Sequence, residues 1–130
     1  MPERLNAYVA LAGRVLLALL FLIEAYEKSV GYAGAVAYAQ AFGVPGILLP
    51  GAIALELLGG LLVVIGWQTR WAALALAAFC VVTALIFHQN LANINEKLHF
   101  LKDLAIAGGF LVLAAGGPGA LSVDEREATV

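Results

Sequence analysis

The chain has 130 residues, of which 63% are hydrophobic and 12% charged, and its formal net charge is −2. A soluble domain carries roughly 25% charged residues, so this composition excludes an ordinary soluble domain and indicates a membrane protein. The seven lysines and arginines form no cluster, which gives nucleic-acid binding no electrostatic basis. We therefore predict a single all-α domain over residues 1–130, a transmembrane four-helix bundle in the cytoplasmic (inner) membrane of a bacterium or archaeon.

The first apolar run predicts a spanning helix over residues 5–26. Arg14 interrupts the run, and charged residues follow it where a signal peptide would have its small-residue cleavage site, so we expect this helix to be retained. At 3.6 residues per turn, Arg14, Glu24 and Lys28 share one side of the helix. A stripe of charge on a spanning helix should face the bundle interior.

The longest connection covers residues 29–50. Its middle, YAGAVAYAQAF at residues 32–42, predicts a short interfacial helix across the mouth of the bundle, because its aromatic side chains suit the headgroup level. An ordered loop is the alternative for this segment.

The second predicted span, residues 47–65, carries Glu56 near its middle. An ionisable group at this depth costs at least ~2.5–3.5 kcal/mol unless a partner offsets the cost. Arg14 stays charged in any protein environment, and its planar guanidinium can bind one carboxylate with two hydrogen bonds. Because consecutive antiparallel helices place their midpoints side by side, we predict an ion pair between Arg14 and Glu56.

Two further spans are predicted over residues 71–87 and 94–115. His88 follows the first of these, and Asn93 should cap the second, with Glu96 at the spacing of a capping box. We expect the tail from residue 121 to be mobile. Four spans place both termini on one side of the membrane, and the distribution of basic residues favours the cytoplasmic side.

The stretches GRVLLALLFLIEAYEK, PGAIALELLGGLLVVIGWQTRWAAL and HFLKDLAIAGGFLVLAAGGPGALSVD make the chain resemble the DoxX family of small four-helix membrane proteins. The resemblance covers nearly the whole chain. It implies a membrane subunit of a thiosulfate-oxidising, quinone-reducing complex or a role in thiol redox defence. Glu24 and Asp103 depart from the family pattern and make the interior more acidic. The matching positions are Arg14, Lys28, Glu56, Gly59, Gly60, Gly66, Arg70, Lys102, Gly108, Gly109, Gly117, Pro118 and Asp124.

The candidate site is a polar cluster inside the bundle. We expect no metal or haem site, because the two histidines lack the spacing that would clamp one ion and lie near one membrane edge. We also expect Cys80 to lie among apolar side chains as an inert thiol. The residues predicted to form the cluster are Arg14, Glu24, Lys28, Glu56, His88, His99, Lys102 and Asp103.

Two interpretations of this cluster remain open. Buried ion pairs could fix the helix register, or the cluster could form a polar pocket for a quinone or a small anion, with donors for the quinone carbonyls and Glu56 as a proton acceptor. The functional hypothesis is an integral membrane subunit of a thiol-, sulfur- or quinone-linked redox system, an oxidoreductase subunit without its own redox centre. It has no covalently bound cofactor, and its partners are the lipid bilayer and either a redox subunit or further copies of itself. The alternatives are a non-catalytic scaffold or accessory protein, and a small transporter or proton path.

Overall fold

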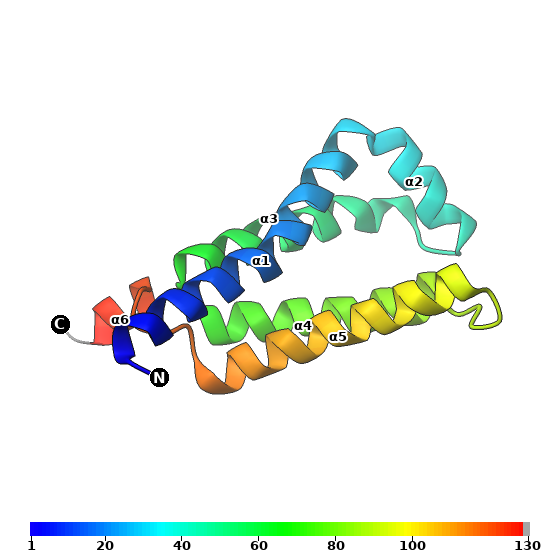
Figure 1. Ribbon diagram of the computed structural model, residues 1–130. Helices are drawn as coiled ribbons and strands as arrows, with labels where there is room; N and C mark the ends of the chain where they lie inside the picture. The colour runs from blue at the N-terminus through cyan, green and yellow to red at the C-terminus, as the bar shows by residue number, and fades with distance from the viewer. Residues whose placement is uncertain (129–130) are drawn as a thin grey trace.

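The structure, a computed structural model, describes residues 1–128, and every regular element in that range is helical (Figure 1). Four of its helical segments are long and apolar enough to cross a membrane, which confirms the predicted all-α class with four spans. The short helix predicted between the first two spans is also present, as α2. The elements are α1 (Glu3–Val30), α2 (Tyr32–Ala41), the 3-10 turn η1 (Gly46–Leu48), α3 (Leu49–Ile65), α4 (Thr69–Phe87), α5 (Ile94–Gly116) and α6 (Val123–Ala128).

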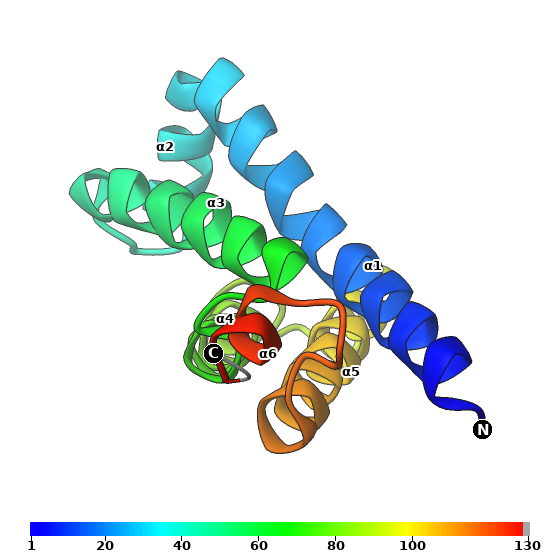
Figure 2. The ribbon, with the colours of Figure 1, turned by 90° about the vertical axis from the view of Figure 1, so that its left-hand side faces the viewer.

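The four long helices are arranged as two pairs. Helix α1 packs on α3 and α4 packs on α5, while α3 against α4 forms the main contact between the pairs. Figures 1 and 2 show that the two pairs approach each other near α6 and diverge toward α2. The bundle is therefore a wedge that is wider at the α2 end.

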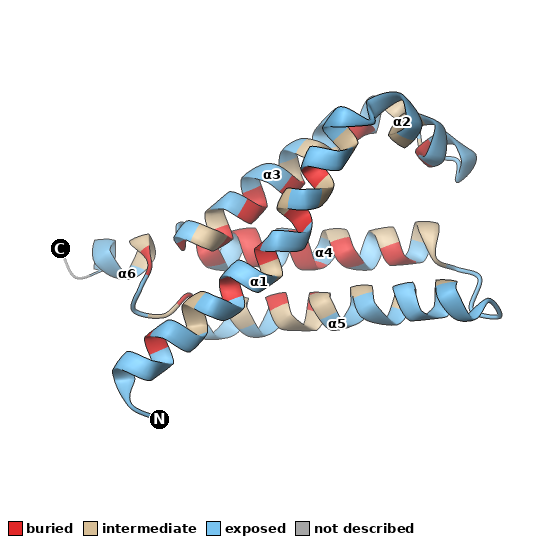
Figure 3. Ribbon diagram, turned by 45° about the horizontal axis from the view of Figure 1, so that its top comes forward, coloured by how far each residue is buried: buried red, intermediate tan, exposed pale blue. Residues whose placement is uncertain are grey.

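The core lies where the two pairs meet. Phe21, Leu76 and Phe110 are almost fully buried, and the rings of Phe21 and Phe110 are 5.5 Å apart. Cys80 belongs to the same cluster and is 3% exposed, which confirms its predicted apolar surroundings. Figure 3 shows the buried residues on the inner faces of the helices and exposed residues on the outer faces. Because the outer faces are largely apolar, they suit contact with lipid.

The segment after α5 closes the narrow end of the wedge. The backbone N–H of Asp124 donates to the carbonyl of Gly66 (2.8 Å), and Arg70 Nη1 donates to the carbonyls of Ala114 (2.9 Å) and Ala115 (2.6 Å) at the end of α5. Gly66 has a φ of +74°, and a Cβ there would lie 2.4 Å from the Cβ of Ser122, so only glycine fits this approach. The expectation of a mobile tail from residue 121 is therefore wrong as far as Ala128; residues 129–130 lie outside the described part of the chain.

Candidate functional site

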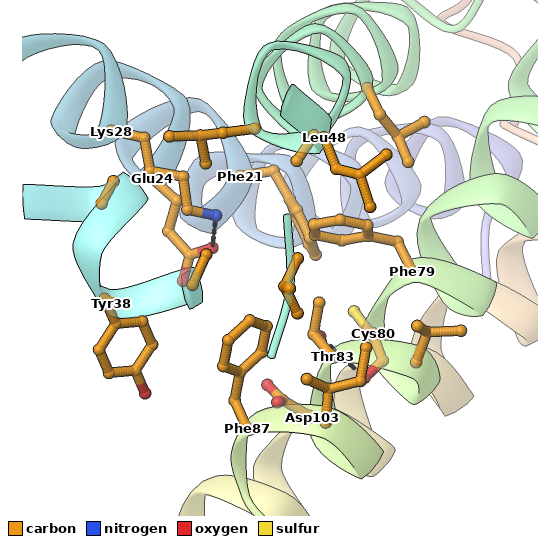
Figure 4. A pocket seen from close by; sticks show the side chains of 18 of the residues that line it. Phe21, Glu24, Lys28, Tyr38, Leu48, Phe79, Cys80, Thr83, Phe87 and Asp103 are labelled. Atoms are coloured by element: carbon orange, nitrogen blue, oxygen red, sulfur yellow. Dashed lines mark hydrogen bonds and ion pairs between the residues drawn. The ribbon is translucent and has the colours of Figure 1, made fainter. Parts of the chain in front are cut away.

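A cavity of about 670 Å³ occupies the wide end of the wedge (Figure 4). Its walls come from α1, α2, α3 and α4, with His99 and Asp103 contributed by α5. Most of the lining is aliphatic or aromatic, including Phe21 and Phe79. The polar residues that line it are Glu24, Glu27, Lys28, Tyr38, Thr83, His88, His99 and Asp103.

One wall is centred on Lys28, near the end of α1. Its ammonium contacts Glu56 Oε1 of α3 and lies 3.7 Å from Glu24 Oε2, one turn back on α1. The same ammonium lies 5.8 Å from the centroid of the Phe79 ring, a cation–π distance. Glu56 is fully buried, and its Oε2 has no hydrogen-bond partner among residues 1–128. Two carboxylates thus share one ammonium, which leaves this wall with an excess of hydrogen-bond acceptors.

The opposite wall carries a histidine between two carboxylates. His88 Nδ1 is 2.9 Å from Glu96 Oε2, and His88 Nε2 is 3.8 Å from Asp103 Oδ2. His99 stacks on His88 with the ring centroids 5.2 Å apart. Asn93 caps α5 as predicted, because its side-chain oxygen accepts hydrogen bonds from the backbone N–H groups of Asn95 and Glu96.

Three aromatic rings link α2 and the segment after it to the end of α4. Tyr38 stacks on Phe87 at 5.4 Å, and Phe42 lies 5.1 Å from each of these two rings. We call Tyr38, Phe42 and Phe87 the aromatic clasp. Burial, and then the negative charge of Glu96, raise the pKa of Tyr38, so its phenol stays protonated beside the cavity.

The predicted ion pair between Arg14 and Glu56 is wrong, because Glu56 pairs with Lys28 instead. Gly60 of α3 lies close against Leu22 of α1, since a Cβ there would be 2.9 Å from Leu22 Cδ2, and Glu56, one turn before Gly60, lies beside Lys28 in the later part of α1. Arg14 therefore meets the other end of α3.

Arg14 is bound entirely by backbone carbonyls at the narrow end of the wedge. Its Nε donates to Val63 (2.9 Å), its Nη2 to Val64 (2.7 Å), and its Nη1 to Pro118 (2.7 Å) and Leu121 (2.9 Å). The last carbonyls of a helix have no partner within it, and the guanidinium fork has enough donors to bind those of α3 and of the returning chain together. Arg14 thus joins three segments of the chain, away from the cavity.

The structure brings together most, but not all, of the predicted cluster. Lys102 is exposed on α5 and does not line the cavity, so its predicted place in the interior is wrong. Glu24, Lys28, His88, His99 and Asp103 line the cavity, and Glu56 lies behind Lys28. The sequence analysis did not predict that Phe79 or the aromatic clasp belongs to the site. Phe42 and Phe87 stand at the ends of apolar runs, and this position could have indicated a role at the membrane edge. Among residues 1–128, no group of three or more His, Cys, Asp or Glu side chains is placed to hold a metal ion.

Comparison with known proteins gives relatives of known location. A family model described as DoxX matches residues 9–89. The chain is 45% identical over 122 residues to the inner membrane protein YqjF of Escherichia coli, covering 94% of each protein, and 34% identical over 123 residues to the inner membrane protein YphA of the same organism, covering 89% of this chain and 88% of YphA. It is also 25% identical over 130 residues to the ER-derived vesicles protein ERV29 of Saccharomyces cerevisiae, which is 96% of this chain and 36% of that longer protein. No solved structure matches the chain significantly.

Proposed function

This chain belongs to the DoxX family of integral membrane proteins, and we propose that it is a membrane subunit of a redox system that binds a quinone-class molecule in the cavity beside Lys28. The observation that carries the proposal is the cavity itself. Its volume of about 670 Å³ lies within the ~300–1,000 Å³ of typical small-molecule sites. It combines apolar walls with a few polar groups, and it lies between helices that can span a membrane.

The lining suits a flat ring with oxygen atoms at both ends. Phe21 and Phe79 meet edge to face at 6.4 Å, and aromatic side chains of this kind favour stacking or edge contacts with a ligand ring. Figure 4 shows Lys28 and Glu24 on one side of the cavity and Asp103 on the other, so polar atoms at opposite ends of a ring would each meet a polar wall. The diverging helix pairs leave room for an apolar tail to reach lipid.

In this proposal the chain itself binds the quinone, and a partner subunit carries out the electron transfer. The names of its inner-membrane relatives state a location and no reaction. A binding subunit that presents a lipid-soluble carrier to a redox partner fits a chain whose polar groups line a cavity.

A cavity-filling variant tests this proposal without disturbing the buried charges. Ala52 lines the cavity, whereas Ala54 lies exposed on the same helix and does not. The wild-type protein in lipid nanodiscs should bind a short-tailed ubiquinone at about one molecule per chain. Ala52→Phe should weaken binding about tenfold or more by steric exclusion, and Ala54→Phe should leave it unchanged. The measurement is equilibrium dialysis with quinone quantified by absorbance.

Equal binding by the two variants would place the quinone outside this cavity, and absence of binding to the wild type would remove the proposal. In the latter case the alternative of a non-catalytic scaffold or accessory protein would be favoured. The third alternative, a small transporter or proton path, predicts proton flux in liposomes that Ala52→Phe reduces and Ala54→Phe does not.

A further inference from the structure

We propose that the cavity binds lipophilic organic cations, molecules that carry an ammonium group on an apolar body, with Asp103 as the counter-ion. This ligand class goes beyond the quinone of the proposed function and does not depend on a redox role. Hydrogen bonding alone selects no ligand here, because the ammonium of Lys28 and the imidazoles can donate while the carboxylates accept. The charge of the cavity and the rings on its walls do distinguish one class of ligand from another.

The charged groups around the cavity are negative in sum, whatever the protonation of its histidines. Among residues 1–128, Lys28 is the one lysine or arginine that lines the cavity, and both lysines of α5 are exposed outside the lining. Protonation of His88 and His99 would add two further positive charges at most. The carboxylates still outnumber these groups, even if the fully buried Glu56 holds a proton. The carboxylates that line the cavity or contact a residue in its lining are Glu24, Glu27, Asp103, Glu56 and Glu96.

Asp103 is the lining carboxylate that no lysine or arginine accompanies in the described part of the chain. It lies about 14 Å along α5, a helix that can span a membrane, and its side chain is 25% exposed. Its ion-pair partner is His88, whose Nε2 is 3.8 Å away and whose Nδ1 lies 2.9 Å from Glu96. One imidazole is thus shared between two carboxylates. A carboxylate at this depth is costly without a partner, and the ammonium of a ligand would offset that cost.

Aromatic rings line the space in which such a ligand would lie. Phe79 already faces the ammonium of Lys28, with 5.8 Å between the nitrogen and the ring centroid. Phe21, Tyr38 and Phe87 also line the cavity, and Figure 4 shows Phe87 on the same side as Asp103, away from Lys28. Ring faces attract cations through their quadrupole, and this attraction is stronger where water is excluded.

The sign of a ligand's charge should therefore decide its affinity. A quaternary ammonium group keeps its charge at any pH and has no N–H to donate, so its binding reports charge and not hydrogen bonding. A neutral ligand of the same shape fills the same apolar space without an attraction to Asp103. An anion of similar shape meets an excess of carboxylates and is repelled.

Three probes that share one ring system test this on the full-length protein. They are naphthylmethyl-trimethylammonium, its neutral carbon isostere neopentylnaphthalene, and the anion naphthylmethanesulfonate. Nanodiscs of zwitterionic phosphatidylcholine avoid attraction of the cation to lipid, and empty nanodiscs correct for partition into the bilayer. Equilibrium dialysis at pH 7 should show about one cation bound per chain, about tenfold or more tightly than the neutral isostere. The sulfonate should not bind above the empty discs.

Matched variants locate the charge and the cavity. Asp103→Asn removes the charge and keeps the size, so it should reduce the preference for the cation over the neutral isostere several-fold. Glu3→Gln makes the same change at an exposed position at the far end of α1 and should leave the preference unchanged. Ala52→Phe should weaken binding of both probes by filling the cavity, and Ala54→Phe should weaken neither.

The outcomes separate this proposal from the proposed function. Equal binding of the cation and the neutral isostere, or a preference that Asp103→Asn leaves unchanged, would overturn the cation site. Cation binding that Ala52→Phe does not reduce would place the cation elsewhere and overturn it too. Binding of the cation but not of ubiquinone would overturn the quinone proposal alone, and the reverse result would overturn the cation site alone. If Asp103→Asn does not fold, the three probes on the wild type and the two alanine variants still decide.

Discussion

Arg14 illustrates how one buried charge can be stabilised without a carboxylate in direct contact. It is 2% exposed, and all four of its hydrogen bonds go to backbone carbonyls. Hydrogen bonds to a charged group contribute roughly 1.5–3 kcal/mol each and are not additive. We therefore expect Arg14→Met to lower the free energy of unfolding by more than ~3 kcal/mol, because it also leaves buried carbonyls unpaired. Denaturation in mixed micelles measures this, with the exposed Arg4→Met as the control. A decrease in the free energy of unfolding as small as that of Arg4→Met would contradict this prediction.

The partner of Glu56 can be tested by double-mutant cycles. Glu56→Gln with Lys28→Met should show a coupling energy within the ~0.5–3 kcal/mol typical of residues in one ion-pair network. Glu56→Gln with Arg14→Met should be additive within ~0.5 kcal/mol, because the two side chains bind at different ends of α3. The same unfolding measurement serves both cycles. Strong coupling of Glu56 to Arg14, or none to Lys28, would contradict the ion pair between Glu56 and Lys28.

At the scale of elements, the start of α4 is capped by a residue from another part of the chain. The carboxylate of Asp124 accepts hydrogen bonds from the N–H groups of Gln68 (2.8 Å) and Thr69 (2.9 Å) and from the Thr69 hydroxyl (2.7 Å). Burial opposes the charged form, but the hydrogen bonds from Thr69 and Gln68 and the charge of Arg14 outweigh it, so the pKa of Asp124 lies below its ordinary value of 3.8. The charged carboxylate also suits the positive end of the helix dipole.

The pH dependence of this cap follows from the direction of that shift. The pKa of Asp124 is lower in the folded state than in the unfolded state. The charged carboxylate therefore contributes fully to stability at pH values above its ordinary pKa of 3.8, and this contribution is lost as the pH falls through the lowered pKa of the folded state. Asp124→Ala should cost ~0.5–2 kcal/mol at neutral pH, the usual cost of losing a helix cap. Asp124→Asn should cost less, because asparagine caps helices well. The stability of this variant should also not show the decrease at acidic pH that titration of Asp124 causes in the wild type. The fluorescence of Trp67 and Trp71, which flank the cap, measures both effects. An acid transition that persists in Asp124→Asn would assign it to another group.

At the scale of the whole molecule, the aromatic clasp joins the two helix pairs at the wide end of the wedge. Tyr38→Ala removes the ring contacts with Phe42 and Phe87, which contribute ~0.5–1.5 kcal/mol per pair beyond the area they bury. We expect faster hydrogen exchange in α2 and in residues 42–48, and unchanged exchange in the α6 end of the bundle, where the Arg14 contacts persist. Tyr32→Ala on the same helix is the control, since Tyr32 makes no ring contact among the described residues. Identical exchange in the two variants would show that the clasp does not restrain α2.

The sequence alone determined that this chain is a helical membrane protein with four spans. The apolar runs are long enough to cross a bilayer, and turns containing Gly, Pro or Asn separate the later ones, so their number needed no tertiary information. It also determined the cap at Asn93, which depends only on neighbouring residues. The acidic excess around Glu24 and Asp103 was visible in the composition of the spans.

Only the tertiary structure decided how the charges pair and where the cavity lies. Gly60 of α3 lies close against Leu22 of α1, and in this register Glu56 meets Lys28 and not Arg14. The partners of Arg14 are carbonyls, which every residue has, so no sequence pattern could indicate them. The cavity exists because the helix pairs diverge, and that angle comes from the packing of many side chains in contact. Residue identity fixes what each helix can bury, whereas the register and angle between helices fix which groups meet.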